Sequence, residues 1–510
     1  MKKISIAFLA GMALFTVASC GDLLNIDQHG VTSVERFYKT DEDILSAGAA
    51  MYYDLRDQYP NGIMIKCAID DDFYAGGGGR GDNSQVEYLD EFTYDAEHGT
   101  ISGYFKGLYT IIFDANIILE KVDSTLSETA AMVYNEAKVF RAYSYFELIT
   151  LWGNVPYVDH VLSPEEYQIP NGSADQLWAL VERDLKSAIS SGKLSSKTSV
   201  DDKKTWRITK EAAQALLGKA YLWQGKNKEA AEVLDQVINS GKYSLFNEYG
   251  EMLDIANKHN CESIIEFDHP IDFNNITFNF LNGMAMWRLS KMSGVPSDLA
   301  PDGFGFYTPS KDLYNEFLTV ESPDGYRLNE TLRTYAQLNS QFGITLKEPH
   351  YANEGYFMWK SRLKANQIIG AVWVTTRNKI LMRYGEVLLL AAEANLTENP
   401  TKATSYFNMI RERAGASTVA SVNLPMIQTE KRLELCYEGC RWQDLNRWGI
   451  AADKLSQTGK SYPMLEMDGT ISYRETNNPT YGFKKGKHEL LPIPAEEMRV
   501  NNVIKQNPGW

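Results

Sequence analysis

The segment 208–240, with the sequence ITKEAAQALLGKAYLWQGKNKEAAEVLDQVINS, constrains the fold more than any other part of the chain. Its apolar residues recur at helical spacing on both sides of Gly225, which predicts two helices joined by a short turn. Gly218, Tyr221, Ala230 and Leu234 match the small and large positions of the tetratricopeptide repeat of about 34 residues. Because one such hairpin cannot bury its apolar face alone, we expect further helical pairs.

Helical periodicity recurs before and after this hairpin. Helices are predicted over 41–59, 101–122, 129–152, 173–190, 381–396, 401–414 and 426–448. Pro60-Asn61-Gly62 is expected to end the first of them, with 63–69 as a separate short apolar piece. The four cysteines 67, 261, 436 and 440, the last two as helical neighbours, are too few for a disulfide framework, so we expect buried free thiols.

The periodicity fades between 242 and 380, where Gly, Pro, Asn and aromatic residues become frequent. Short strands are predicted at 263–267 and 356–359, with one helix at 309–318. The predicted fold is therefore mainly α. A tetratricopeptide-like helical scaffold (41–241 and 381–450) carries a loop-rich, mixed lobe (242–380 and 451–510) within one domain, 41–510.

The N-terminus carries the pattern of a processed leader. Lys2 and Lys3 precede an apolar run and then small residues, so 1–19 is interpreted as a signal peptide. Cys20 stands where bacterial signal peptidase leaves a cysteine for lipid attachment, which predicts a lipidated Cys20 followed by a tether over 20–40. The alternative is an ordinary secreted protein with a chance cysteine.

The formal net charge of −15 argues against nucleic acid as a partner and against a body that lies flat on anionic lipid. The seven histidines are scattered, and the chain has no H-E-x-x-H, G-x-S-x-G or P-loop motif. We therefore expect a binding protein rather than an enzyme. Glycoside hydrolysis needs only two carboxylates and stays open as a minor alternative.

The loop 70–83, DDDFYAGGGGRGDN, is the main candidate site, because four consecutive glycines favour no regular structure. Its carboxylate, amide and guanidinium groups suit the vicinal hydroxyls of a sugar, and its aromatic rings suit a sugar's C–H face. The candidate ligand residues here are Asp71, Asp72, Tyr74, Arg80 and Asn83. One alternative is a solvated turn; another is calcium at the acidic triplet, although the spacing departs from an EF-hand.

Two tryptophans of the irregular lobe, Trp287 and Trp373, are further candidates. An aromatic ring on a loop offers a large stacking surface at low entropic cost. The alternative for each is an ordinary place in the core.

Five stretches, in order between residues 137 and 510, resemble the SusD/RagB family of outer-membrane lipoproteins. They are AKVFRAYSYFELITLWGNVPYV, GFYTPSKDLYNEF, LMRYGEVLLLAAEA, RERAG followed by EKRLELCYEGCRWQDLNRWG, and the closing LLPIPAEEM and NNVIKQNPGW. The chain departs from the family at Cys440, where histidine is usual, and at Trp510, where tyrosine is commoner.

The resemblance implies a scaffold of four tetratricopeptide-like pairs and a lipid-anchored protein at the surface of the outer membrane. It also implies non-catalytic capture of oligosaccharide or polysaccharide, delivered to a SusC-like TonB-dependent transporter, with no cofactor. The alternatives are a peptide-binding member of the same uptake system and a tetratricopeptide-type adaptor.

Overall fold

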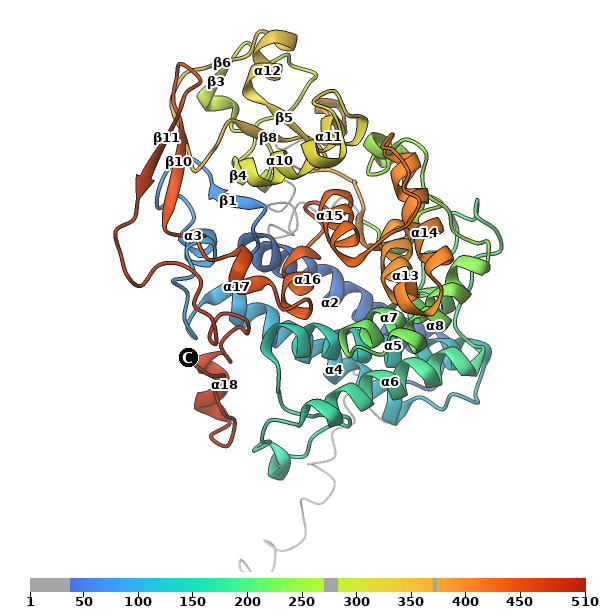
Figure 1. The fold of residues 1–510 in the computed structure, drawn as a ribbon. Coiled ribbons are helices and arrows are strands. Elements are labelled where there is room, and N and C mark those ends of the chain that lie inside the picture. Colours follow the sequence, from blue (N-terminus) through green and yellow to red (C-terminus); the bar gives the residue numbers. More distant parts are fainter. Residues whose placement is uncertain (1–36, 270–282, 370–373) are drawn as a thin grey trace, which may run out of the picture.

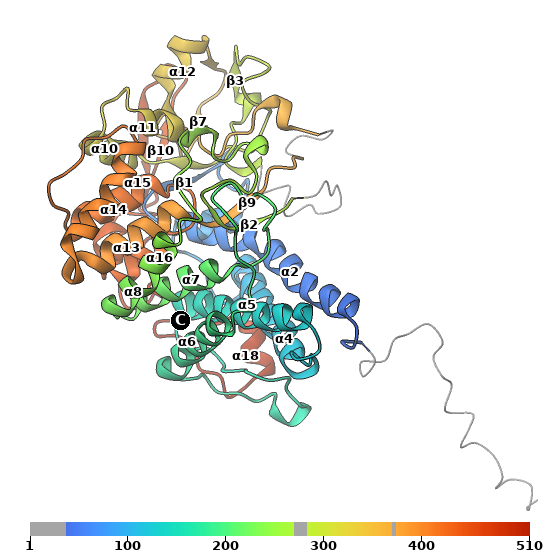
Figure 2. The ribbon, with the colours of Figure 1, turned by 90° about the vertical axis from the view of Figure 1, so that its right-hand side faces the viewer.

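The computed structural model describes residues 37–269, 283–369 and 374–510, and it confirms the mainly α fold (Figure 1). The scaffold helices are α2 (Asp41–Ala68), α4 (Gly99–Lys121), α5 (Glu128–Trp152), α6 (Ala174–Ser191), α7 (Lys210–Trp223), α8 (Asn227–Asn239), α13 (Tyr384–Glu398) and α14 (Pro400–Arg413). Each of these eight scaffold helices packs against the one named after it. Helix α13 therefore packs directly against α8, although the lobe separates them in the chain. The lobe covers one side of this array (Figure 2).

The hairpin of α7 and α8 forms as predicted. Thr209 caps α7 by accepting a hydrogen bond from the backbone N–H of Ala212, and Gly225 makes the turn with φ 70°. A Cβ atom at Gly218 would collide with the side chain of Leu234 on α8. Glycine at this position is therefore what lets the two helices approach closely.

Two helix boundaries were predicted wrongly. Helix α2 does not end at Pro60; it continues to Ala68, because the residues after the proline, such as Ile63 and Ile65, are buried in the core. Tertiary packing outweighs the local break here. The predicted helix 426–448 is instead two helices, α15 (Leu424–Glu434) and α16 (Arg441–Arg447).

The break between α15 and α16 has a local cause. Tyr437 and Gly439 both adopt left-handed backbone conformations, with φ 61° and 71°, which no continuous helix allows. Cys436 and Cys440 are therefore on a turn and not on one helix. Both are buried free thiols, as is Cys67, while Cys261 is half-buried.

The lobe contains more helix than predicted, because α10 (Lys311–Val320) is followed by α11 (Tyr326–Thr331) and α12 (Tyr335–Phe342). Its antiparallel strand pairs are β1 (Phe73–Gly76) with β4 (Phe306–Pro309), β3 (Met292–Ser293) with β6 (Thr345–Leu346), β5 (Leu332–Thr334) with β8 (Tyr356–Met358), and β10 (Ser461–Leu465) with both β11 (Ile471–Glu475) and β7 (His350–Tyr351). A further pair, β2 (Ser263–Phe267) with β9 (Lys379–Arg383), lies beside the scaffold. The short helices α3 (Ser84–Asp90), α17 (Ala451–Lys454) and α18 (Ala495–Val500) complete the described elements used below.

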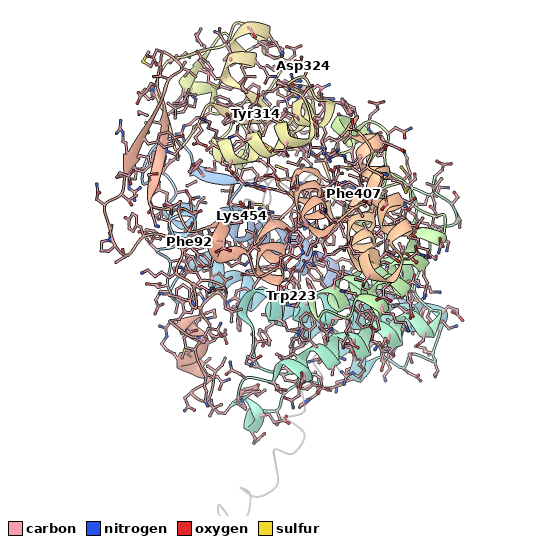
Figure 3. All side chains as sticks on the ribbon, viewed as in Figure 1. Phe92, Trp223, Tyr314, Asp324, Phe407 and Lys454 are labelled. Carbon is pink, nitrogen blue, oxygen red and sulfur yellow. The ribbon has the colours of Figure 1, made fainter. Side chains whose placement is uncertain are left out.

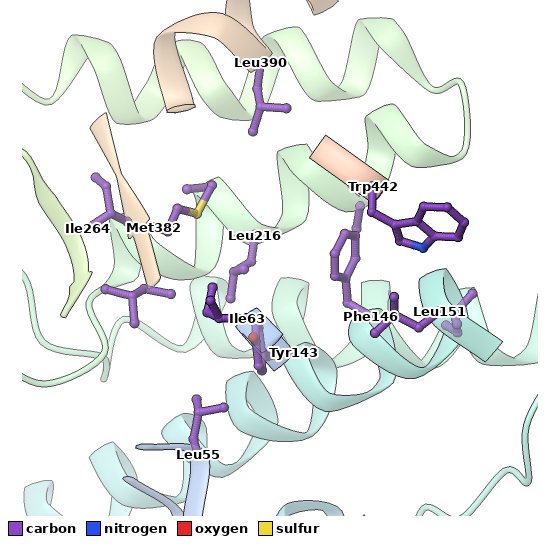
Figure 4. Close-up of a cluster of buried hydrophobic side chains, with 14 of the residues drawn as sticks. Leu55, Ile63, Tyr143, Phe146, Leu151, Leu216, Ile264, Met382, Leu390 and Trp442 are labelled. Carbon is purple, nitrogen blue, oxygen red and sulfur yellow. The ribbon is translucent and has the colours of Figure 1, made fainter. Parts of the chain in front are cut away.

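The main hydrophobic core runs through the scaffold. Figure 4 shows side chains from α2, α5, α7, α13 and β9 converging, among them Ile63, Leu216, Leu390 and Met382. A smaller cluster around Trp287 fills the lobe. The lobe thus has its own apolar centre and is not simply a set of loops on the scaffold.

Candidate functional site

The glycine-rich loop is fastened to the lobe at its start. In β1, Tyr74 is paired with Thr308 of β4, and the N–H of Gly77 donates to the carbonyl of Gly305 at 2.7 Å. Gly76 has φ 68°, and a Cβ atom there would collide with the Gly305 carbonyl oxygen. The glycines therefore serve a close backbone approach, so this part of the loop is ordered.

Two carboxylates of the acidic triplet before the loop, Asp71 and Asp72, are ion-paired, while Asp70 accepts a hydrogen bond from the Asp72 N–H at 2.9 Å. Asp71 accepts hydrogen bonds from Nε and Nη2 of Arg441, both at 2.7 Å, and Asp72 accepts one from Nε of Arg432 at 2.6 Å. Burial alone would raise the pKa of Asp71, but Arg432 and Arg441 hold that pKa below its usual value.

These pairs change the interpretation of the triplet. Asp72 is only 1% exposed and Asp71 has both oxygens engaged by Arg441, so the two carboxylates fasten the loop to α15 and α16. The burial of Asp72 leaves it little access to a ligand, whereas Asp71 lines a polar cleft together with Tyr74, so ligand binding by Asp71 stays a prediction. Calcium at this triplet would leave two buried guanidinium groups without their partners, which disfavours it.

Arg80, in contrast, is exposed and surrounded by tyrosines. Its guanidinium pairs with both carboxylate oxygens of Glu91, at 2.5 and 3.0 Å, and it also donates to the hydroxyls of Tyr351 and Tyr481, each at 3.2 Å. The ring of Tyr462 lies 5.7 Å from the guanidinium carbon. We call Arg80, Tyr351, Tyr462 and Tyr481 the Arg80 face.

The residues of the Arg80 face are supported by two adjacent strands and by a buried glutamate. Tyr351 of β7 and Tyr462 of β10 are on adjacent strands, with ring centroids 5.1 Å apart. Glu91 is buried, while the Arg80 side chain keeps 39% of its surface exposed. The planar cation of Arg80 and the half-buried rings of Tyr462 and Tyr481 are thus presented to solvent, while Tyr351 is only 6% exposed and supports Arg80 from the interior side. Such an arrangement suits recognition of a polar ring-shaped ligand.

Tyr74 and Asn83 have different environments. Asn83 caps α3 by accepting a hydrogen bond from the Val86 N–H at 3.4 Å, which is a structural task. Tyr74 is half-buried, hydrogen-bonds to Glu354, and lines a polar cleft of about 300 Å³. Lys454 of α17, labelled in Figure 3, lines the same cleft.

Trp287 is not a surface platform. Its ring is 2% exposed, its Nε1–H donates to the carbonyl of Met358 at 3.0 Å, and it packs against Phe357 and Trp359 in the lobe cluster. The structure thus favours the alternative for Trp287, a place in the core, because the lobe has an apolar centre of its own that the sequence pattern did not reveal. Trp373 and Cys20 lie outside the residues that the structure describes.

Comparison with known proteins identifies the family. A model described as the SusD family matches residues 323–510, and one described as "Starch-binding associating with outer membrane" matches residues 51–222. The chain belongs to the SusD/RagB family. Among curated relatives, SusD-like protein P2 of Formosa agariphila is 24% identical over the whole of both chains.

Solved SusD-like structures show the same fold. A structure titled "Laminarin binding SusD-like protein" is 28% identical with a TM-score of 0.79, and the match covers 93% of this chain and 100% of that one. Surface glycan-binding protein A from Bacteroides thetaiotaomicron in complex with laminarihexaose is 22% identical with a TM-score of 0.73, over 92% and 99% of the two chains. The second likeness concerns the fold alone.

Across the described parts of this SusD/RagB chain, no helix is long and apolar enough to cross a membrane. In the same residues, no group of three or more His, Cys, Asp or Glu side chains is placed to hold a metal ion.

Arg80 is a candidate from the sequence, but the tyrosines around it are not among the candidates. Tyr351, Tyr462 and Tyr481 lie far from Arg80 in the chain, and no local spacing connects them. Alternation in the short strands around 351 and 462 was the one available signal, and it predicts a strand without saying which strand is its neighbour.

Proposed function

We propose that this protein is a non-catalytic glycan-binding lipoprotein of the cell surface, which captures oligosaccharide or polysaccharide at the Arg80 face. The observation that carries the proposal is the exposed guanidinium of Arg80 set among three tyrosines and paired with Glu91. The likeness to a laminarin-binding SusD-like protein, over nearly the whole of both chains, supports the same class of ligand.

The chemistry of the Arg80 face fits a sugar. Tyrosine rings can stack on the C–H face of a pyranose and their hydroxyls can bond its hydroxyls. The fork of the Arg80 guanidinium is taken up by Glu91 and by the hydroxyls of Tyr351 and Tyr481, so Arg80 would orient these hydroxyls and offer its planar face to a sugar. The adjacent cleft with Tyr74 and the half-exposed Tyr473, whose hydroxyl donates to Glu354 at 2.5 Å, extends the polar surface for a longer chain.

Delivery and anchoring are parts of the same proposal. A signal peptide over 1–19 and lipid on Cys20 would hold the protein at the outer membrane, where a SusC-like TonB-dependent transporter would take up the captured glycan. In a cell that makes Cys20→Ala, the protein should leave the membrane fraction; unchanged membrane attachment would contradict lipidation.

Calorimetry of the mature body against a glycan panel tests the binding proposal, beginning with laminarin oligosaccharides. Arg80→Met should weaken binding at least about tenfold, because charged hydrogen bonds typically contribute about 1.5–3 kcal/mol. Arg499→Met is the matched control, since Arg499 is also an exposed arginine paired with a glutamate, Glu97, at 3.0 Å.

The panel also separates the alternatives. Saturable binding of peptides without binding of any glycan would favour the peptide-binding member of the family and reject the proposal. Appearance of shortened products from a bound glycan would instead indicate a hydrolase. Equal losses in Arg80→Met and Arg499→Met would move the site away from the Arg80 face.

A further inference from the structure

A second cavity lies against the turn between α15 and α16. It has a volume of about 70 Å³ and is lined by α2, by β9 and its approach, and by the turn itself. The lining side chains with polar ends include Lys360, Ser361, Arg377, Lys379, Tyr437 and Glu438. None of these belongs to the Arg80 face or to the cleft beside it.

Positive charge is concentrated in this cavity. Arg377 is 7% exposed, and its guanidinium donates to the backbone carbonyls of Lys360, Ser361 and Arg362 at 3.2–3.4 Å. Within the described ranges, no carboxylate forms an ion pair with it; Asp254, which is paired with Lys364, acts on Arg377 only through its charge. Burial lowers the pKa of Arg377 to about 10, and burial together with Arg377 lowers the pKa of Lys379 to about 7.

The acid that lines the cavity does not balance this charge. Glu438 is ion-paired with Lys360 and accepts from Nε and Nη2 of Arg383 at 2.8 and 2.9 Å. Both of its oxygens are therefore engaged by other cations. A buried guanidinium group without a counter-charge is costly even when its hydrogen bonds are made, because backbone carbonyls supply dipoles and no net charge.

Two hydroxyl groups at the cavity also lack partners. The Ser361 Oγ and Tyr437 Oη atoms are buried and have no hydrogen-bond partner in the described part of the chain. Each such group costs about 1–3 kcal/mol if it stays unpaired. Tyr437 is in addition a non-glycine residue with a left-handed backbone, at φ 61°, a conformation that often accompanies function.

We propose that this cavity binds a small oxyanion, namely a carboxylate, sulfate or phosphate group, through the hydroxyls of Tyr437 and Ser361 and the charge of Arg377. One such ligand would satisfy both hydroxyls and supply the missing negative charge. A water molecule could accept from the hydroxyls but would leave Arg377 with the charge of Asp254 alone, outside ion-pair distance, to oppose its own. The oxyanion comes either from a free inorganic ion or from an acidic group on a sugar.

Thermal unfolding of the mature body tests the proposal, with inorganic sulfate or phosphate at low millimolar concentration against chloride of equal ionic strength. Low concentrations are needed because sulfate stabilises proteins non-specifically when concentrated. Wild type should show a saturable rise in Tm of about 2–4 °C. Tyr437→Phe, which removes one oxygen atom, should lose most of that rise, and so should Ser361→Ala.

Two controls make the result specific. Tyr94→Phe and Ser144→Ala remove hydroxyls that are likewise buried and unpartnered but lie outside this cavity, so they should keep the wild-type rise. The responses are compared as differences between salts, so a changed basal Tm does not obscure them. Equal Tm values in chloride and in both oxyanions, or an unchanged rise in Tyr437→Phe and Ser361→Ala, would overturn the proposal.

A second arm identifies the source of the oxyanion. Glucuronate and a sugar sulfate are compared with glucose in wild type and in Tyr437→Phe. A Tyr437-dependent rise with the acidic sugars supports an oxyanion carried on a glycan, while a rise with the inorganic ions alone supports a free anion. If acidic sugars and glucose act alike and the inorganic ions have no effect, the cavity is not an oxyanion site.

Discussion

Contacts within the helical scaffold differ from those between the scaffold and the loop-rich lobe in their share of apolar packing. Within the scaffold, helices meet mainly through apolar and small residues, as where Gly218 of α7 admits Leu234 of α8, and buried ion pairs such as Arg141 with Asp184 add to these contacts. Between lobe and scaffold, buried charges do much of the joining. Arg327 of α11 donates from Nη1 to Glu430 at 2.6 Å and to Glu434 at 3.1 Å, both on α15.

The charged junction extends beyond one pair. Arg383, at the end of β9, and Arg413 of α14 both pair with Glu262 of the lobe, at 2.6 and 3.3 Å. Both arginines also pair with Glu434 of α15, so this glutamate holds them in place on the scaffold side. Every one of these side chains is at most 5% exposed. Apolar contacts between neighbouring helices leave a periodic pattern in the sequence, whereas ion pairs between distant segments leave no such pattern.

The largest predicted effect comes from breaking the charged junction at Glu434. Glu434→Gln keeps the shape of the side chain but leaves the charges of Arg327, Arg383 and Arg413 less balanced in the interior. Removing one partner of a buried ion pair typically costs about 3–5 kcal/mol. We expect a loss of that size in the free energy of unfolding, measured by urea titration.

An exposed ion pair provides the control for Glu434→Gln. Glu128 is 85% exposed and pairs with Lys193 at 2.9 Å, so Glu128→Gln should change stability by less than about 1 kcal/mol. Similar small losses in both variants would mean that the junction is hydrated and that the lobe is held by apolar packing, as the scaffold is.

The same contrast explains what could be predicted from the sequence. The scaffold was predictable, because each helical pair is continuous in the chain and its apolar spacing is local. The extension of α2 past Pro60 was missed, since the burial of Ile63 depends on distant helices. At the candidate site, Arg80 was found from its loop, but Asp72 was assigned to ligand because its partner Arg432 is remote in the chain.

A smaller effect is expected from the scaffold at Gly218. Gly218→Ala adds a methyl group that collides with Leu234, and overpacking of this kind typically costs about 1–3 kcal/mol. Gly103→Ala is the matched control, because Gly103 is exposed in α4 and its added Cβ would lie 3.7 Å from the Asn61 side chain, an ordinary contact. Gly103→Ala should be neutral or stabilising. Equal effects at the two glycines would show that α7 and α8 can separate without loss.

The last prediction concerns how stability changes with pH through Asp90 of α3, a buried carboxyl group beside the lobe. Its Oδ2 accepts from the N–H of Ala75 in β1 at 2.8 Å, and burial, with Glu91 and Glu87 adding to it, raises its pKa to about 8. The unfolded chain loses this proton near the ordinary pKa of 3.8, so between about pH 4 and pH 8 the folded form binds the extra proton. The contribution of Asp90 is therefore present at low pH and is lost as pH rises toward 8.

Asp90→Asn should remove this pH dependence while keeping an oxygen acceptor for Ala75. The difference in unfolding free energy, variant minus wild type, should then grow by about 1 kcal/mol per pH unit between about pH 5 and pH 8, measured by urea titration at each pH. Because subtracting the wild type cancels all other titrating groups, parallel profiles would mean that Asp90 is already ionised in the folded protein. A growing difference would show that the join at β1 weakens with rising pH through a single group. The Gly218–Leu234 contact involves no titratable side chain, so the loss caused by Gly218→Ala should stay constant over the same pH range.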